Sequence, residues 1–244
     1  MFEIEAKGIY YRDLNRMIRE AVAKGEKDIR VTNVNGQYYI GDGISGKPTI
    51  TIEGVHGNDL AAFMDGPTLI IKANAQDNIS NTMNSGKVVI HGNAGDVLGY
   101  GMRGGKLHIR GSVGYRVGIH MKGNKKQAPT IVVGGTAGDF FGEYMAGGVL
   151  VLLGLSSDGE PLVGDYLGTG MHGGTIYIRG EVEKKNCGAE VGVLELDDED
   201  QKVLKEVLTD YCADLGLKLE EVMSKPFKKL VPVSARPYGN LYAY

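Results

Sequence analysis

The sequence predicts an all-β protein dominated by a right-handed, single-stranded parallel β-helix of about seven coils. Three observations lead to this fold. Glycine supplies 38 of the 244 residues, about twice its usual share of about 7%. Six methionines (Met64, Met83, Met102, Met121, Met145 and Met171) recur at spacings of 19, 19, 19, 24 and 26 residues, and one short β-rich run lies in each repeat. This period is too short for a propeller blade, and the leucine and asparagine pattern of a horseshoe repeat is missing.

The β-rich runs are the elements that we expect to stack. They cover residues 49–53, 68–72, 87–91, 106–110, 130–134, 149–153 and 175–179. Their alternation and their enrichment in β-branched residues are typical of strands. Equivalent strands of successive coils would then lie about 4.8 Å apart. The two longer spacings indicate insertions at loop corners, over residues 124–128 and about 156–161.

Small residues keep the same phase as the methionines. They stand two residues after each methionine, and three and seven residues before it, with Gln76 as the larger exception. Glycine is needed where the backbone takes a positive φ or where neighbouring coils leave no room for a side chain. The methionines are expected to point inward, because a flexible thioether fills uneven gaps in a core. The high glycine content is therefore a requirement of coil geometry.

The flanks of the repeat are expected to cover its ends, which gives three regions: residues 1–47, 48–194 and 195–244. In the first, residues 13–23 form an amphipathic helix that ends near Gly25, and Asn35-Gly36 is the turn of a hairpin between residues 29–31 and 38–40. In the last, the acidic run 197–200 starts a helix that reaches Gly216. We expect this helix to cap the open end of the solenoid, and residues 227–244 to form an extended arm.

Charge and composition exclude several kinds of partner. With 27 basic and 30 acidic residues the formal charge is −3, and the basic residues are scattered, so we expect neither nucleic acid nor a membrane as partner. No apolar run approaches the roughly 18 residues of a membrane span, and the N-terminus lacks a signal-peptide pattern. Cys187 and Cys212 form no CxxC motif, which favours a cytoplasmic protein with reduced thiols.

The repeat offers no recognisable catalytic or cofactor motif. The five histidines fall at five different phases, so we expect them at the surface or at loop corners and predict no histidine metal site. The glycine-rich residues 99–105 lead into a strand, whereas a nucleotide-binding loop leads into a helix. No Ser-His-Asp or Cys-His pattern is visible, although a triad assembled in space stays open. We therefore assign no catalytic residue, no cofactor site and no metal site to these motifs.

An aspartate row is the one ordered set of ionisable residues. Asp77, Asp96, Asp139 and Asp165 each stand six residues before a repeat methionine. Carboxylates of neighbouring coils would lie about 5 Å apart, so they need solvent, hydrogen bonds or a bridging cation. The favoured interpretation is that each aspartate binds the backbone of its own corner, as in Asx turns. The alternative is that the row binds a cation or a partner.

Three tandem copies of a GxxGxxxG motif resemble a known family. The motif glycines are Gly92, Gly95 and Gly99, then Gly111, Gly114 and Gly118, then Gly135, Gly138 and Gly142. With the segments 81–86, 99–105 and 168–174, they resemble the GXGXG β-helix domain at the C-terminus of the glutamate synthase large subunit, over about residues 33–193. Residues 227–232 are similar to the FxKxxP ending of that domain.

The resemblance implies a structural role. In glutamate synthase a glutaminase domain with an N-terminal cysteine releases ammonia, and a domain with FMN and an iron-sulfur cluster uses it to convert 2-oxoglutarate to glutamate. The β-helix domain carries neither reaction. Position 2 here is Phe2, and two cysteines are too few for a cluster. The chain is thus expected to be a stand-alone, non-catalytic subunit without a cofactor, with the catalytic and glutaminase subunits as partners and a second copy of itself as a further possible one.

Two alternatives stay open at this point. Formylmethanofuran dehydrogenase has a subunit similar to the same module. A β-helix that binds saccharides would use a groove of aromatic and acidic side chains, which the aspartate row and several tyrosines favour and the absence of tryptophan disfavours.

Overall fold

One continuous sheet runs through the whole molecule. The computed structural model describes residues 1–123, 127–157 and 161–233. Within them eleven strands hydrogen-bond in the order β1-β2-β3-β4-β5-β6-β7-β8-β9-β11-β10. Parts of the two predicted insertions (124–126 and 158–160) and of the predicted arm (234–244) lie outside the described residues.

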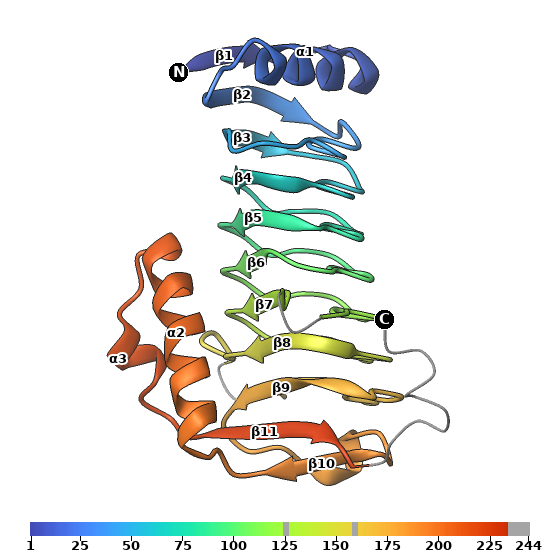
Figure 1. The fold of residues 1–244 in the computed structure, drawn as a ribbon, viewed down its shortest axis with the longest axis vertical. Coiled ribbons are helices and arrows are strands. Elements are labelled where there is room, and N and C mark those ends of the chain that lie inside the picture. The colour runs from blue at the N-terminus through green and yellow to red at the C-terminus, as the bar shows by residue number, and fades with distance from the viewer. Residues whose placement is uncertain (124–126, 158–160, 234–244) are drawn as a thin grey trace.

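The seven predicted β-rich runs all form parallel strands. They are β3 (Thr49–Val55), β4 (Asp65–Ile71), β5 (Ser85–Ile90), β6 (Lys106–Ile109), β7 (Thr130–Val133), β8 (Ala146–Leu152) and β9 (Gly173–Arg179). They stack one per coil, as Figure 1 shows, with equivalent residues of successive coils in register. The predicted β-solenoid is confirmed. Six return arcs join β3 to β9, so these repeats make about six turns where the sequence indicated about seven.

The interior of the solenoid is an apolar column built from equivalent side chains of each coil. The six repeat methionines point inward and are at most 1% exposed, which confirms the predicted ladder. A second ladder lies four residues before each methionine and is fully buried: Leu60, Ile79, Leu98, Val117, Phe141 and Leu167. Each coil buries its apolar residues against the coils above and below, as repeat architectures require.

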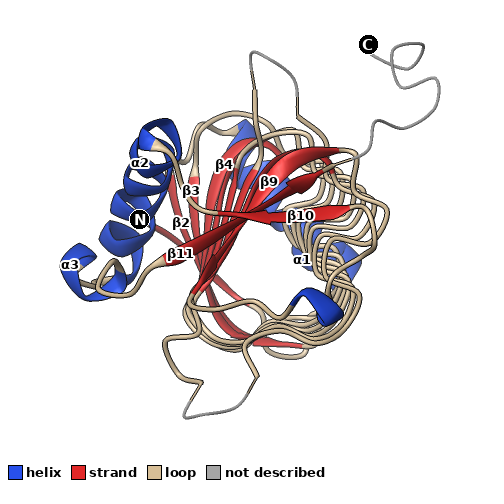
Figure 2. Ribbon diagram, turned by 90° about the horizontal axis from the view of Figure 1, so that it is seen from below, coloured by secondary structure: helices blue, strands red, loops and turns tan. Residues whose placement is uncertain are grey.

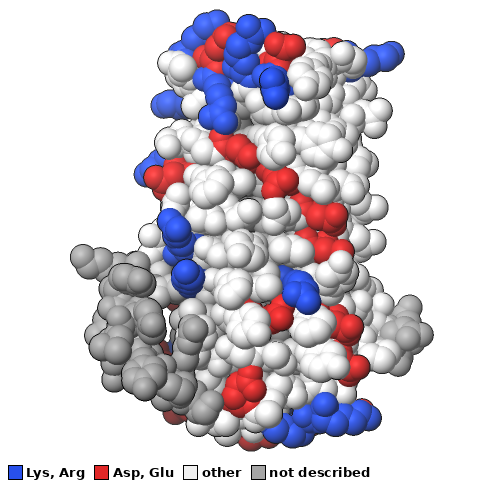
Figure 3. Space-filling view, turned by 90° about the vertical axis from the view of Figure 1, so that its right-hand side faces the viewer, with Lys and Arg blue, Asp and Glu red and all other residues white. Residues whose placement is uncertain are grey.

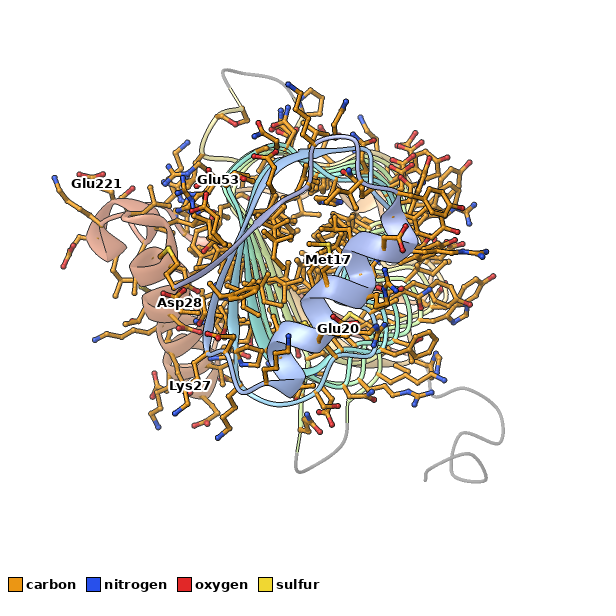
Figure 4. The ribbon with its side chains drawn as sticks, turned by 90° about the horizontal axis from the view of Figure 1, so that it is seen from above. Met17, Glu20, Lys27, Asp28, Glu53 and Glu221 are labelled. Carbon is orange, nitrogen blue, oxygen red and sulfur yellow. The ribbon has the colours of Figure 1, made fainter. Side chains whose placement is uncertain are left out.

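The N-terminal end is closed by α1 and β1. Helix α1 (Tyr11–Ala23) forms as predicted and lies across the top of the stack, where Leu14 and Ile18 are fully buried and Met17 packs on the same core (Figure 4). Strand β1 (Phe2–Glu5) pairs in parallel with β2 (Asp28–Asn35) and forms the edge of the sheet.

The predicted hairpin at Asn35-Gly36 is wrong. Strand β2 pairs in parallel with β3, and residues 38–40 form no strand. Gly36 has a φ of 79° and donates its N–H to the carbonyl of Val55 in the next coil. An Asn-Gly pair favours a left-handed backbone conformation. Both a hairpin turn and a corner of a solenoid need that conformation, so the pair does not distinguish between them. Residues 36–48 therefore form a return arc that stacks on the repeats.

The C-terminal helix forms where the sequence predicts it but lies in another place. Helix α2 (Asp198–Leu215) begins with a capping box between Asp197 and Asp200 and ends at Gly216. It lies along the outer face of the sheet, as Figures 1 and 2 show, and packs its apolar stripe on outward side chains such as Val132 and Val151. It does not cap the open end. A short 3-10 turn (Lys184–Asn186) precedes β10, and the short helix α3 (Leu219–Val222) follows α2.

Two antiparallel strands close the C-terminal end instead. Strand β11 (Phe227–Pro232) lies between β9 and β10 (Val191–Leu194) and pairs antiparallel with both. The edge of β9 is thus occupied by a strand, which forms hydrogen bonds with the exposed backbone groups of β9. A helix could not pair with that edge in this way. The predicted FxKxxP segment is this strand. Cys187 and Cys212 are free cysteines. Among the described residues, no helix combines the length and apolar character that crossing a membrane requires.

Candidate functional site

The motif glycines make room for side chains of the preceding coil. A Cβ atom on Gly114 would lie 1.7 Å from Oδ1 of Asp96, and one on Gly95 would lie 2.0 Å from Oδ1 of Asp77. The first glycine of each copy meets a similar group, with a Cβ 2.1–2.3 Å from an oxygen of Asn74, Asn93 or Ser112. The first and second glycines of the motif therefore lie against polar side chains one coil earlier, except Gly138, which meets only backbone atoms of the preceding coil.

The third glycine of each copy has a different role. Gly99, Gly118 and Gly142 have φ values of 68°, 76° and 75°, in the left-handed region. A Cβ on Gly118 would also lie 2.9 Å from a methyl group of Leu150 in the core. Both the backbone conformation and the packed interior favour glycine here. Ala61 and Ser80 have the same left-handed conformation at this phase in earlier coils.

The aspartate row is a ladder of side-chain-to-backbone hydrogen bonds. Three of the four carboxylates accept a hydrogen bond from the backbone N–H at the same phase of the next coil: Asp77 from Asp96 (2.9 Å), Asp96 from Tyr115 (3.0 Å) and Asp139 from Asp165 (2.9 Å). The favoured interpretation, in which each aspartate binds its own corner, is wrong in this respect. The coil spacing brings the next coil's N–H within reach of Oδ1, so the aspartates connect coils. A parallel ladder from Asn74 through Asn93 and Ser112 does the same at the neighbouring corner.

We expect Gly114→Ala to lower the free energy of unfolding by about 1–3 kcal/mol, because the new methyl group displaces the Asp96 carboxylate and leaves the Tyr115 N–H without its acceptor. In an Asp96→Ala background the same substitution should cost less, since nothing remains to be displaced. Urea unfolding of the four chains of this double-mutant cycle measures the coupling. Strictly additive effects would show that the glycine and the carboxylate do not interact.

The row does not assemble a metal site in the described part of the chain. Among the described residues, one group of His, Cys, Asp or Glu side chains has three ligand atoms within 4.8 Å of one another. It consists of His108, Asp210 and Asp214, none of which belongs to the aspartate row. Asp139 and Asp165 are exposed, and Asp77 and Asp96 are half-buried. The Oδ1 atoms of Asp77, Asp96 and Asp139 are engaged in the ladder. Binding of a partner or cation by the row remains a prediction.

A polar cluster beneath α2 was not predicted from the sequence. We call it the α2 anchor cluster: Lys87, Lys106 and His108 on the sheet, and Asp210 and Asp214 on the helix. Lys87 Nζ lies 2.8 Å from a carboxylate oxygen of each aspartate, Lys106 Nζ lies 2.7 Å from Asp210, and His108 Nδ1 lies 2.7 Å from Asp214. The two aspartates are four residues apart, so they share one face of the helix.

Electrostatics favour the charged forms of the two aspartates in this cluster. Burial by itself would raise the pKa of Asp210, but hydrogen bonds from Lys106 and Lys87 outweigh it and lower the pKa to about 2. For Asp214 burial is likewise outweighed, by hydrogen bonds from His108 and Lys87, and its pKa is lowered. The set His108, Asp210 and Asp214 has donors that suit a metal ion, but the Lys87 ammonium already lies between both carboxylates. The arrangement is therefore best suited to holding α2 on the sheet.

Acid should weaken this attachment, and the sign follows from the lowered pKa. The Asp210 carboxylate contributes about 2 kcal/mol above an unfolded pKa near 4, and that contribution is lost as the pH falls towards 2. We expect Asp210→Asn to be less stable than the parent chain at pH 7 and equally stable near pH 2. Urea unfolding across this range is the measurement. Glu206→Gln, at an exposed position of the same helix, is the control and should leave the pH dependence unchanged.

Two histidines are buried, contrary to the expectation that all five lie at the surface or at corners. His108 is 1% exposed, below α2, and contacts the ring of Tyr211 edge-on at 5.5 Å. His56 is also 1% exposed and points into the solenoid, where its Nδ1 lies 2.5 Å from the Gly57 carbonyl and its Nε2 has no hydrogen-bond partner. Burial lowers the pKa of His56 more than the Gly57 carbonyl raises it. His56 shares its phase with core residues such as Ala75 and Ala94, so the repeat register could have indicated its burial. The burial of His108 depends on α2, which the register does not reveal.

The fold and the ladders define a class of protein. It is a parallel β-solenoid in which tandem glycine motifs at the corners leave room for stacked polar side chains. The chain belongs to the GXGXG motif family, whose profile matches residues 13–235. It is also 44% identical over 248 residues to an uncharacterized protein of Methanocaldococcus jannaschii, with 98% of this chain and 95% of the relative covered. The GXGXG domain predicted from the three motif copies is thus confirmed.

Proposed function

We propose that this protein is a non-catalytic structural subunit of a cytoplasmic glutamate synthase assembled from separate chains. It would hold a glutaminase subunit and an FMN and iron-sulfur subunit, which together convert glutamine and 2-oxoglutarate to glutamate. The observation that carries the proposal is membership of the GXGXG family over nearly the whole chain. The in-register motif copies support it, since they are the feature that resembles the glutamate synthase domain.

The geometry is suited to a rigid support. Successive coils are joined by the parallel backbone ladder and by two ladders of polar side chains. Both end strands of the repeat are covered by further elements. At one end β2, β1 and α1 follow β3, and at the other β11 and β10 follow β9. Partners would therefore bind the sides of the rod. The half-buried carboxylates of Asp210 and Asp214 are held by lysines, which supports a role for that cluster in attaching the helix.

The test is isolation of the native assembly. A tagged chain, expressed from its own locus, should co-purify with a flavin and iron-sulfur subunit and a glutaminase. The purified assembly should form glutamate from glutamine and 2-oxoglutarate, and removal of this chain should reduce that activity. A pterin in place of the flavin would favour the formylmethanofuran dehydrogenase alternative. A chain that repeatedly emerges alone, or only as a homo-oligomer, would contradict both, and a polysaccharide-binding screen would then test the saccharide alternative.

A further inference from the structure

A groove runs along the exposed side of α1. It has a volume of about 570 Å³ and lies between the helix and the return arc that follows β2. Sites for small ligands commonly have a volume of this order. We call it the α1 groove and define it by six of the residues that line it, which are Tyr11, Arg12, Arg16, Arg19, Tyr39 and Asp42. The three arginines stand four and three residues apart, so they share one side of the helix.

Arginine is concentrated at this end of the molecule. Three of the nine arginines of the chain lie within eight residues of α1, although the whole chain has a formal charge of −3. Figure 3 shows Lys and Arg side chains gathered at the end where α1 lies, whereas an oblique row of acidic side chains follows the coils below. The carboxylates that line the groove are Asp42 and Glu20, which Figure 4 labels on the helix. The groove thus differs in charge from the surface below it.

The arginines of the groove have hydrogen-bond donors to spare. A guanidinium carries five N–H groups. Arg12 donates from Nε to the hydroxyl of Tyr11 at 3.3 Å, and Arg16 NH2 lies 3.0 Å from a carboxylate oxygen of Asp13. Arg19 donates to a backbone carbonyl of the return arc. Within the described part of the chain, these contacts leave most of the N–H groups to solvent or to the oxygen atoms of a ligand.

The Asp42 carboxyl lies among these arginines without an arginine partner. Arg19 donates to the backbone carbonyl of Asp42, and the carboxyl itself accepts the N–H of Ala62 at 2.9 Å. Burial raises the pKa of Asp42 to about 7, although the Ala62 N–H opposes the shift. The charge of Asp59 acts in the same direction as burial, and that of Arg19 acts against it. Near neutral pH this carboxyl is therefore protonated in a large share of the molecules and can donate a hydrogen bond.

The protonation state of Asp42 decides the charge of the groove. When Asp42 is neutral, the three arginines outnumber the two other carboxylates nearby, those of Glu20 and Asp13. When it is ionised, that excess of positive charge is cancelled. Guanidinium groups bind the oxygens of phosphate and carboxylate groups, often through two parallel hydrogen bonds. An anion beside Asp42 would in turn favour its neutral form.

We propose that the α1 groove binds a small anion through phosphate or carboxylate oxygens, with the three arginines and the Asp42 carboxyl group as hydrogen-bond donors. The rings of Tyr11 and Tyr39, whose centres lie 5.7 Å apart, supply an apolar wall for the remainder of the ligand. Because the neutral form of Asp42 is the binding form, a proton is taken up when the anion binds near neutral pH. The inference concerns a ligand site and does not depend on the proposed function.

Two probe anions test the site by nuclear magnetic resonance titration of the ¹⁵N-labelled chain at low ionic strength. Sulfate presents a tetrahedral group like that of a phosphate, and tartrate presents two carboxylates. Both keep a constant charge between pH 6 and pH 8. Either probe should shift the amide signals of residues 11–23 and 38–43 in a saturable way, with a dissociation constant of about 1 mM or lower at pH 6. The probe that binds more tightly identifies the ligand as phosphate-like or as a carboxylate, and chloride should give no saturable shift.

The arginines are tested with a double variant. The combined substitutions Arg12→Gln and Arg16→Gln, at exposed positions, should weaken binding of both probes by about tenfold or more, because they remove two charged donors. The matched control is Arg103→Gln, which removes an exposed arginine of a later coil and should bind like the parent chain. Circular dichroism and the melting temperature check that each variant keeps the fold.

The role of Asp42 is tested through pH. The parent chain should bind about tenfold more weakly at pH 8 than at pH 6, since Asp42 changes over this range from mainly neutral to mainly ionised. Asp42→Asn keeps an acceptor for the Ala62 N–H and adds a donor that does not titrate. Its affinity should therefore be the same at both pH values. A pH dependence that persists in Asp42→Asn would overturn the part assigned to this carboxyl.

The site as a whole fails under two results. One is the absence of a saturable shift of the groove signals with either probe. The other is equal affinity of the parent chain and the double arginine variant. All of these measurements use the chain alone, so their outcome is the same whether or not the proposed assembly exists.

Discussion

Gly134→Ala is expected to lower the free energy of unfolding by about 3 kcal/mol or more. Gly134 follows β7 at the point where the sheet meets α2. A Cβ atom there would lie 2.1 Å from the backbone oxygen of Arg110 and 2.4 Å from the hydroxyl of Tyr211. The Arg110 oxygen belongs to the preceding coil and cannot move without disturbing the stack. The Tyr211 hydroxyl is held by the carbonyl of Ile109 at 3.1 Å.

The matched control is Gly138→Ala, four residues further along. Its Cβ would meet only backbone atoms of the preceding coil, and none closer than 3.2 Å, so we expect a clearly smaller loss of stability. Urea unfolding followed by circular dichroism compares the two variants. Tyr211→Phe in the Gly134→Ala chain should recover only part of the loss, because the contact with the Arg110 oxygen remains. Equal losses for Gly134→Ala and Gly138→Ala would contradict the explanation from backbone contact.

Phe141→Ala should have an effect of similar size, about 3–5 kcal/mol. Phe141 is fully buried in the inner ladder four residues before the repeat methionines. Truncation would leave a cavity inside a column whose walls are fixed by the backbone ladder, so the neighbouring coils can collapse into it only slightly.

The control again comes from the repeat. Leu98 and Leu167 fill the same ladder position in other coils and are also fully buried. Phe141→Leu should therefore cost less than half as much as Phe141→Ala. Thermal and urea unfolding of both variants provide the comparison. A Phe141→Ala chain as stable as the Phe141→Leu chain would show that the column relaxes much more than a stacked solenoid permits.

The repeat itself could be predicted almost completely from the sequence. The spacing of Met83, Met102 and Met121 is constant, and each coil contacts mainly its neighbours, so local sequence carries the information that defines the architecture. The same periodicity identified the glycines of the motif. Their partners were only partly foreseen, because sequence shows that Asp96 and Gly114 lie in adjacent coils but not that the carboxylate extends over the glycine to the Tyr115 N–H.

The flanking elements were less predictable. Asn35-Gly36 indicates a left-handed corner, but a local signal does not tell whether the next segment pairs antiparallel as a hairpin or returns as a coil. The stripe on α2 predicts an apolar face without naming the surface that it covers. The α2 anchor cluster joins residues more than 100 positions apart, such as Lys87 and Asp210, and no periodicity relates them.

By itself, therefore, the sequence determined the solenoid, its inward methionines, the segments of chain that form both long helices, and the family. Each of these depends on spacing along the chain, within one element or between adjacent coils. Only the tertiary structure decided that α2 lies on the side of the rod, that β11 closes its end and that aspartates connect coils. Those features depend on which surfaces meet across long separations in the chain, where packing and charge, and not local pattern, select the partner.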